Sequence, residues 1–195
     1  MARPREFETE DVLAKAMQFF WSQGFERASM SDLEAYTGLL RGSIYSAFGE
    51  KAEFYRQALG HYIEQEVSAA EAMLRGEASK ESAAKRLSRF IQLPIEPIGP
   101  NGERKGCFLC NAAIDRAPHC EQTKAIVQQG FCRLERALEF ALSEQFEKTP
   151  RKELRAMAAQ LLSNYFGMRV LAKGGAPTAM LKSIKTRVLS ELSIA

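Results

Sequence analysis

Apolar residues recur at helical spacing along almost the whole chain, and this feature limits the possible folds more than any other. In residues 9–23, for example, Val12, Ala16 and Phe20 are four residues apart, which places them on one face of a helix. No segment shows the period-two alternation that is typical of a half-buried strand. We therefore expect an all-α fold of about nine helices, with glycines and prolines at the breaks.

The breaks divide the chain into a compact start and a longer remainder. Gly24 ends the first helix, Ser29 and Asp32 form a variant of the capping box, and Gly38 lies in the next turn. The one extended irregular stretch is the Pro- and Gly-rich segment 93–106. The expected helices cover residues 9–23, 30–36, 40–47, 51–75, 80–92, 107–116, 121–147, 151–173 and 177–193.

The composition is ordinary for a soluble globular protein. Of 195 residues, 46% are hydrophobic and 26% are charged, and the net charge is +3. No apolar run approaches the ~18 residues that a membrane span requires, and the N-terminus lacks the apolar core of a signal peptide, so we expect a cytoplasmic protein with reduced cysteines. Residues 1–60 hold seven Lys and Arg against nine Asp and Glu, so bulk charge does not favour nucleic acid.

Residues 32–51, DLEAYTGLLRGSIYSAFGEK, predict two helices joined by a tight Thr-Gly turn. This is the layout of a helix-turn-helix, in which the second helix enters the major groove of DNA. Leu40, Ile44 and Phe48 are expected on its inner face. Lys51 begins the next helix, where its ammonium and the helix N-terminus could share a phosphate. The outer face offers Arg41, Ser43, Tyr45 and Ser46, and Gly42 permits close approach of the backbone.

Other functions remain open on this pattern alone. A polar outer face is the default for a surface helix, so a helical corner that binds nothing fits equally well. A helical adaptor that binds another protein is the alternative function, although it has no need for Arg41, Tyr45 and Lys51 on one short helix. An enzyme is not expected, because the chain has two histidines, no Gly-rich phosphate loop and no nucleophile motif. No cofactor is expected either.

Residues 13–59 resemble the DNA-binding domain of TetR-family transcriptional repressors. The likeness is carried by FFWSQGF (19–25), SMSDL (29–33), TGLLRGSIYSAFGEK (37–51) and FYRQAL (54–59). It implies a DNA-binding domain over residues 1–50 and an effector-binding and dimerisation bundle over residues 51–195, connected by helix 51–75. It further implies a repressor that binds a palindromic operator as a homodimer and is released by a small molecule, with an oxidant or electrophile as one option.

Carried over position by position, the resemblance implies DNA contacts from the second helix, from two backbone-contacting residues and from an N-terminal basic arm. These residues are Arg3, Arg5, Ser29, Arg41, Gly42, Ser43, Tyr45, Ser46 and Lys51. The homodimer would form through helices in 151–193. The apolar stripes of that region are richer than one buried face needs: Leu154, Met157, Ala158, Leu161, Leu162, Tyr165, Leu181, Ile184, Val188, Leu189 and Leu192.

Three interpretations of the cysteines remain open: they are small buried side chains, redox thiols or metal ligands. Cys107 follows Arg104 and Lys105 at an expected helix start, and both features would lower the pKa of its thiol. Metal ligation would add His119, but the spacing matches no zinc finger, so no metal is assigned. The possible redox thiols are Cys107, Cys110 and Cys120.

An effector pocket in the C-terminal bundle is a further implication of the resemblance. Aromatic residues at helical spacing are candidates for its walls, although such residues also form ordinary cores. Asn111 and Arg169 carry more weight, because a buried polar or charged group needs a partner. The expected lining is Phe90, Phe108, Asn111, Tyr165, Phe166 and Arg169.

Overall fold

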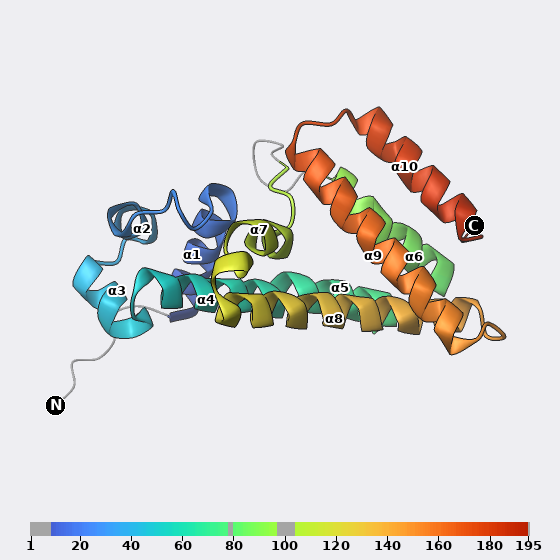
Figure 1. Ribbon diagram of the computed structural model, residues 1–195, viewed down its shortest axis with the longest axis horizontal. Helices are drawn as coiled ribbons and strands as arrows, with labels where there is room; N and C mark the ends of the chain where they lie inside the picture. Colours follow the sequence, from blue (N-terminus) through green and yellow to red (C-terminus); the bar gives the residue numbers. More distant parts are fainter. Residues whose placement is uncertain (1–8, 78–79, 97–103, 195) are drawn as a thin grey trace.

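The computed structural model describes residues 9–77, 80–96 and 104–194, and in these ranges every regular element is a helix. Four helices form one end of the molecule (Figure 1): α1 (Thr9–Gln23), α2 (Met30–Thr37), α3 (Arg41–Phe48) and α4 (Lys51–Tyr62). The π-helical turn η1 (Ile63–Val67) joins α4 to α5 (Ser68–Arg75). The other elements are α6 (Ala83–Gln92), η2 (Leu93–Ile95), α7 (Phe108–Asp115), η3 (Ala117–His119), α8 (Glu121–Gln145), α9 (Arg151–Lys173) and α10 (Thr178–Glu191).

The all-α prediction is confirmed. The elements α4, η1 and α5 form one continuous helix over residues 51–75, so the described residues contain nine α-helical rods, as expected. The predicted helix ends agree with the observed ones to within three residues, and α9 has the predicted bounds. Within the described ranges, no helix combines the length and the apolar character of a membrane span.

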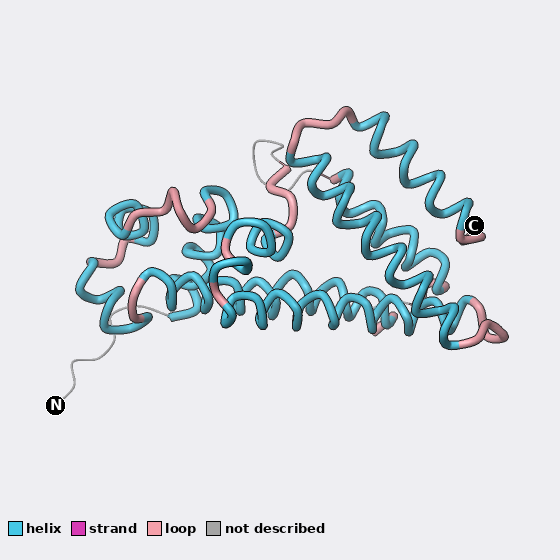
Figure 2. The backbone as a smooth tube through the Cα atoms, in the orientation of Figure 1, coloured by secondary structure: helices cyan, strands magenta, loops and turns pink. Residues whose placement is uncertain are grey.

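The molecule is elongated, and two long helices run along it. Helix 51–75 and α8 lie side by side, and α8 also contacts α6, α7 and α9. Figure 2 shows the short α1, α2 and α3 gathered around the start of α4, whereas α6, α9 and α10 pack at the opposite end. The short helix α7 lies between the two groups, against α4 and α8. It is therefore placed to touch both ends of the molecule.

Local capping fixes the short helices at the N-terminal end. The Ser29 hydroxyl accepts from the Asp32 N–H while the Asp32 carboxylate accepts from the Ser29 N–H, which is the predicted capping box. Gly38 ends α2 with φ +76°, a left-handed conformation that glycine adopts without a Cβ clash. Helices of eight residues are not stable alone in water, so these caps and the core beneath them decide the local structure.

Aromatic side chains hold the N-terminal helices to α4. Phe54 stacks on Phe48 of α3 with ring centroids 4.6 Å apart, and Phe20 of α1 meets Phe54 edge-on. All three rings are fully buried, which stabilises the fold by about 1.5–3 kcal/mol for each side chain. Trp21 is also buried, with its ring edge-on to Tyr62, so it serves packing.

The elements α8, α7 and η1 approach one another closely at Gly130. A Cβ atom there would lie 2.6 Å from Leu109 Cδ1 and 3.4 Å from Ile63 Cδ1. Since the first distance is far below van der Waals contact, only glycine lets the three elements pack this tightly. The same part of η1 is widened, because the backbone N–H of Ser68 donates to the Ile63 carbonyl five residues earlier. Turns of this kind are frequent at functional sites.

Candidate functional site

The outer face of α3 is polar and open. Arg41 and Tyr45 are exposed one turn apart; the Arg41 guanidinium lies over the Tyr45 ring, and its Nη2 donates to the Tyr45 hydroxyl at 3.3 Å. Ser46 is exposed and Ser43 is half-buried. A Cβ atom at Gly42 would meet nothing within 4 Å, so the backbone of α3 is accessible from outside.

Leu40 corrects one detail of the sequence analysis. It was expected on the inner face of α3 with Ile44 and Phe48, but 71% of its surface is exposed, whereas Ile44 and Phe48 are buried. The reason is that Leu40 is the N-cap of α3, where the backbone has not yet taken helical angles. Tyr36 of α2 is also half exposed. Leu40 therefore adds an exposed apolar side chain at the start of the polar face.

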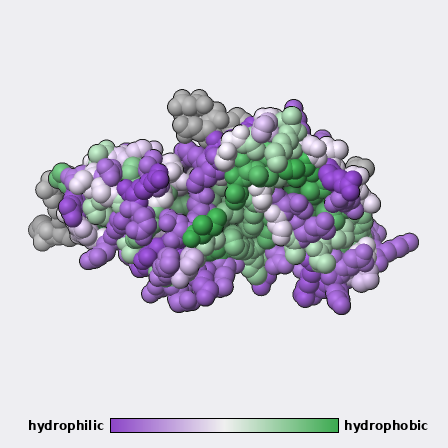
Figure 3. Space-filling view, turned by 45° about the horizontal axis from the view of Figure 1, so that its top comes forward, coloured by the Kyte–Doolittle hydropathy of each residue, from purple (hydrophilic) through white to green (hydrophobic). Residues whose placement is uncertain are grey.

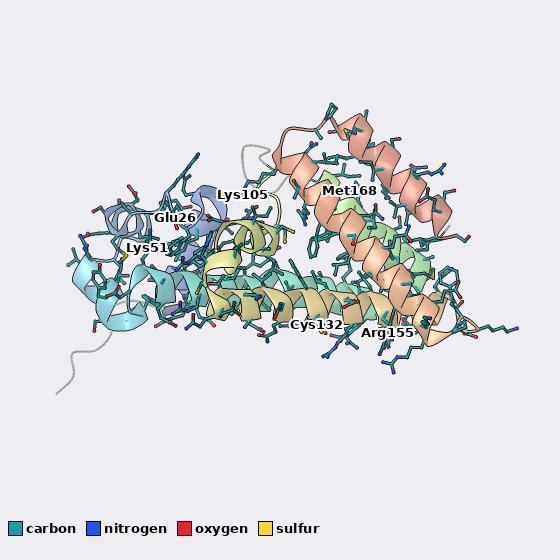
Figure 4. All side chains as sticks on the ribbon, in the orientation of Figure 1. Glu26, Lys51, Lys105, Cys132, Arg155 and Met168 are labelled. Atoms are coloured by element: carbon teal, nitrogen blue, oxygen red, sulfur yellow. The ribbon has the colours of Figure 1, made fainter. Side chains whose placement is uncertain are left out.

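Lys51 lies in the N-terminal group of helices (Figure 4). Some of its N–H donors already have acceptors within the protein. Its ammonium donates to the carbonyls of Phe25, at 3.1 Å, and Ala28, at 2.9 Å, and it lies 4.3 Å from the centre of the Phe25 ring. Lys51 thus ties the loop after α1 to the first turn of α4. An ammonium has three N–H donors, so one remains for another acceptor.

Ser29 is exposed at the start of α2, but its side chain is engaged in the capping box. Its hydrogen bonds to the Asp32 carboxylate lower the pKa of that group. Arg3 and Arg5, the expected basic arm, lie outside the described residues. The structure thus gathers Ser29, Lys51 and the polar face of α3 at one end of the molecule.

A cavity of about 230 Å³ lies in the C-terminal bundle. Of the six expected lining residues, Tyr165 and Arg169 line it, and Phe90, Phe108, Asn111 and Phe166 do not. The sequence analysis missed most of its walls, which come from helix 51–75, from η2 and from α8. The lining consists of Tyr62, Glu66, Val67, Ala69, Ala70, Leu93, Glu96, Cys107, Leu134, Tyr165 and Arg169.

The four residues that do not line the cavity are used for packing. Phe90 is buried and stacks on Tyr165, and Phe108 is buried edge-on to Tyr55 and Tyr62. Phe166 contacts the ring of Phe131 instead. Asn111 donates to the Trp21 carbonyl at 3.4 Å, so its partner belongs to α1. Side-chain type predicted burial for these residues but not the direction in which they face.

Arg169 is a buried cation without a carboxylate partner in the described part of the chain. Only 7% of its surface is exposed, and its Nε and Nη2 donate to the Tyr165 hydroxyl at 3.1 and 2.9 Å. The thiol of Cys107, which is 2% exposed, lies nearby and accepts from the Tyr62 hydroxyl at 3.5 Å. A guanidinium and two phenols thus surround one thiol at the cavity wall.

This environment changes the acidity of the Cys107 thiol. Burial alone would raise its pKa, but hydrogen bonds from Cys110 and Tyr62 and the charge of Arg169 outweigh burial and bring the pKa to about 6. The expected sources, Arg104 and Lys105, point elsewhere: Arg104 bonds the Ala176 carbonyl and Thr178, and Lys105 bonds Gln18. Among the charged groups near Cys107, the Arg169 guanidinium therefore favours the thiolate form.

The other thiols differ from Cys107. Cys110 is buried, and its hydrogen bond to Cys107, followed by burial, raises its pKa. Cys120 is half-buried at the N-cap of α8, where hydrogen bonds from Thr123 lower its pKa to about 7. Cys132 lies on α8 (Figure 4). Across the described residues, no group of three or more His, Cys, Asp or Glu is arranged to hold a metal ion.

Helix α7 links the cavity to the N-terminal helices. Cys107 is its N-cap, and at its other end the Asp115 carboxylate accepts from the Phe25 N–H at 2.9 Å. The guanidinium of Arg116 lies 4.4 Å from the centre of the Phe25 ring. Since Lys51 binds the Phe25 carbonyl, both sides of this residue are held. A shift of α7 would therefore reach the loop that supports α3.

The capped α2, the Gly38 turn and the outward-facing α3 define a helix-turn-helix protein, here joined to a helical bundle with its own cavity. The family model for bacterial regulatory proteins of the tetR family matches residues 12–58. Residues 12–58 therefore form a DNA-binding domain of the TetR family. The protein is a DNA-binding transcriptional regulator and not an enzyme, as the sequence predicted.

Three curated regulators are similar to this chain. The HTH-type transcriptional repressor ComR of Escherichia coli (strain K12) is 26% identical over 185 residues, which cover 93% of this chain and 87% of ComR. The repressor BdcR of the same organism is 30% identical over 121 residues, or 60% of this chain and 57% of BdcR. YezE of Bacillus subtilis, an uncharacterized regulator, is 29% identical over 119 residues, or 61% of this chain and 60% of YezE. The matches to BdcR and YezE thus span less than two thirds of those proteins.

Solved structures share the fold over almost the whole chain. A cysteine-substituted form of the TetR family regulator CifR, complexed with 26bp double-strand operator DNA, has a TM-score of 0.82 at 25% identity, covering 96% of this chain and 98% of CifR. A TetR family regulator from Cytophaga hutchinsonii has a TM-score of 0.81 at 16% identity, with 97% of each chain covered. The C-terminal bundle, which the sequence resemblance did not reach, therefore also has the fold of the family.

Proposed function

We propose that the protein is a repressor that binds a palindromic operator as a homodimer and is released when a thiol-reactive small molecule enters the cavity at Cys107. Residues 1–50 would bind DNA, and residues 51–195 would bind the effector and form the dimer. The observation that carries the proposal is the position of Cys107, which lines the cavity together with Arg169 of α9 and begins the helix that holds α1. The names of ComR and BdcR as repressors support the direction of regulation.

For DNA binding, we propose that α3 lies in the major groove. Arg41, Tyr45 and Ser46 would reach bases and phosphates, with Ser43 and the open backbone at Gly42 close to the duplex. The exposed Leu40 would contact the methyl group of a thymine. The operator complex of CifR supports this arrangement. Ser29 and the free donor of Lys51 would hold the DNA backbone, and Arg3 and Arg5 the minor groove.

For the dimer, we propose the outward faces of α9 and α10. The apolar stripes selected from the sequence mostly face the core of the protomer, because their members are buried or half-buried. The large apolar residues exposed on α9 and α10 are Val170, Leu171 and Met180. Figure 3 shows apolar surface gathered over the same end of the molecule. Small exposed residues such as Ser163 and Gly167 would let a second α9 approach closely. Two α3 helices would then lie about 34 Å apart, one turn of the duplex.

The release step follows from the charge at the cavity. Alkylation of Cys107, or its oxidation to a disulfide, would remove the thiolate and leave the buried Arg169 guanidinium without this neighbouring anion, which is unfavourable. Movement of α9 or α7 would relieve that cost. Since Asp115 holds the Phe25 N–H, movement of α7 would change the loop that positions α3. A small change in the separation of two α3 helices loses contacts on both half-sites.

The decisive experiment measures binding of the purified protein to the DNA just upstream of its own gene. We expect the wild type to shift this DNA and to release it after treatment with a quinone or peroxide. Cys107→Ser should bind the DNA and remain bound after the same treatment. Cys132→Ser is the matched control, because it removes a thiol on α8 outside the cavity and should respond as the wild type does. Equal insensitivity of wild type and Cys107→Ser would contradict the thiol-reactive effector.

A second measurement addresses the dimer. Sedimentation at micromolar concentration should give the mass of two chains, and Gly167→Glu should give one, because it places a charge on the proposed contact face. Thermal unfolding would check that the variant remains folded, since nothing lies within 4 Å of a Cβ at that position. A monomeric wild type would contradict this interface.

A further inference from the structure

Cys107 and Cys110 are placed as a pair at the start of α7. Cys107 is the N-cap, with an extended backbone at φ −119° and ψ 130°, and Cys110 is the third residue of the helix. An N-cap side chain reaches back over the first turn toward this third position. Within a regular helix the Cβ atoms of such residues are about 5–6 Å apart, too far for an unstrained disulfide. The extended N-cap removes this restriction, because the Cα–Cβ bond of Cys107 can turn about the Cα–C bond while the Cys107 carbonyl keeps its hydrogen bond from the Asn111 N–H.

The two thiols have different access to the cavity. Cys107 forms part of the cavity wall, whereas Cys110 does not and is 93% buried behind it. The guanidinium of Arg169 and the Tyr62 hydroxyl lie on the side of Cys107. A small molecule in the cavity therefore meets the Cys107 sulfur first, and Cys110 can react only with Cys107.

From this juxtaposition we propose that Cys107 and Cys110 form a reversible disulfide in response to hydroperoxides, with Cys107 as the attacking thiolate and Cys110 as the resolving thiol. The inference rests on the proposed role of Cys107 and names the chemical class of its effector. It also assigns a task to Cys110, which core packing alone does not require.

The reaction has two steps. In the first, the Cys107 thiolate attacks the nearer oxygen of the hydroperoxide, the O–O bond breaks, and the leaving oxygen takes up a proton as water or an alcohol; Cys107 becomes a sulfenic acid. In the second, the Cys110 sulfur attacks the Cys107 sulfur, the S–S bond forms, and the hydroxyl of the sulfenic acid leaves with the Cys110 proton as water. The peroxide is reduced and the two thiols are oxidised. An external dithiol restores both thiols by exchange.

The environment of each thiol fits its step. The lowered pKa of Cys107 keeps it ionised near neutral pH, and the hydrogen bond to Cys107 that raises the pKa of Cys110 is lost when Cys107 becomes a sulfenic acid, which frees Cys110 to ionise and attack. The cavity volume of about 230 Å³ admits hydrogen peroxide and small organic hydroperoxides. The disulfide would hold residue 107 against the first turn of α7 and withdraw the anion from Arg169.

The test follows the chemistry directly, without DNA. The full-length protein is treated with equimolar cumene hydroperoxide, blocked with iodoacetamide, digested and analysed by mass spectrometry. We expect an internal disulfide joining Cys107 and Cys110, lost after dithiothreitol. In Cys110→Ser and Cys110→Ala, the sulfenic acid on Cys107 should persist and react with dimedone. Agreement between the two variants excludes a folding defect as the cause.

Cys120 provides the matched control, since it is a second thiol of lowered pKa at a helix N-cap but is not part of this pair. Cys120→Ser should leave the disulfide unchanged. A wild type that accumulates dimedone-reactive Cys107, or a disulfide to Cys120 or between two chains, would overturn the proposal. A Cys107–Cys110 disulfide that leaves operator affinity unchanged would uphold the chemistry and contradict the proposed release step instead.

Discussion

At the N-terminal end of the molecule the functional side chains point outward from a core, whereas at the cavity they point inward and come from helices far apart in the chain. Arg41 and Tyr45 sit on one turn of α3 and touch each other and solvent. Tyr62, Cys107 and Arg169 belong to three separate segments and meet only in the folded bundle. An outward site is specified locally, but an inward site depends on the packing of the whole protein.

This difference changes what a substitution can do. On α3, one exposed side chain can be lost without disturbing its neighbours, so binding and stability should separate. Around the cavity, each side chain also sets the charge or position of the next, since Arg169 lowers the pKa of Cys107 and Tyr165 holds Arg169. There, function and stability should change together. The following predictions test this contrast.

Tyr45→Ala should give the largest effect. Each lost base or phosphate contact costs about 1–3 kcal/mol, and a dimer loses it twice, so operator affinity should fall by about 100-fold or more. The melting temperature should stay constant because Tyr45 is exposed. Fluorescence anisotropy and thermal unfolding measure the two quantities, and Tyr45→Phe separates the hydroxyl from the ring. A stable variant with full affinity would remove the outer face of α3 from the interface.

Gly130→Ala should destabilise the cavity end by about 1–3 kcal/mol, because the added methyl group collides with Leu109. Gly60→Ala in α4 is the matched control, since its Cβ meets nothing within 4 Å. Replacing a glycine inside a helix at an open position should stabilise by up to about 1 kcal/mol. Urea denaturation gives both values. The changes in the free energy of unfolding of the two variants should have opposite signs. If both variants gain stability, α7 and α8 pack less tightly at Gly130 than the structure indicates.

Arg169→Gln should raise the pKa of the Cys107 thiol above about 6, because it removes the buried positive charge. At a pH below the pKa, each unit by which the pKa rises lowers the fraction of Cys107 present as thiolate about tenfold. The folded-state pKa of the wild type lies below the unfolded value of about 8.5, so the thiolate stabilises the fold above that pH and this contribution is lost as pH falls toward 6.

The pH profile of iodoacetamide labelling at Cys107 measures the shift. Labelling of Cys120 in the same sample is an internal reference, and Arg169→Lys retains the charge. An unchanged profile at Cys107 in Arg169→Gln would show that Arg169 does not control the thiol.

Lys51→Ala should give the smallest effect. It tests a residue that combines a proposed DNA contact with a structural role, so binding and stability should both change. If one donor of Lys51 holds a phosphate, the salt dependence of operator affinity should weaken by about 0.9 in log–log slope for each contact. The loss of hydrogen bonds to the Phe25 and Ala28 carbonyls should also lower stability by about 1 kcal/mol. A loss of stability with an unchanged slope would make Lys51 purely structural.

The helix-turn-helix could be predicted from the sequence because its signals are local. Ser29 caps Asp32 three residues away, and Gly38 ends α2 through its own backbone angles. Leu40 was placed wrongly because helical spacing was continued one residue beyond the true start of α3. The error lies at a helix end, where periodicity carries no information about the cap.

The cavity could be predicted only in part. Arg169 was found because a buried charged group needs a partner, and Tyr165 because aromatic residues at helical spacing were candidates for the walls. Tyr62 was missed because its direction depends on the π-helical turn that follows it, and the sequence carries no signal for that turn. Phe90 and Phe108 were recognised as buried residues, but which buried ring borders empty space depends on how α6, α7 and α9 pack.

The π-helical turn at residues 63–67 also bears on how this chain is aligned with its homologues. Such a turn holds one residue more than a regular α-helix, so a single deletion there would restore the α-helix and leave both of its ends intact. Because the wide turn absorbs the extra residue, the two halves of helix 51–75 would keep their relative orientation, and the change would fall on side chains of the turn itself, such as Glu66 and Val67 in the cavity wall. A one-residue gap inside this helix, normally treated as an alignment error, would therefore mark homologues that respond to a different effector.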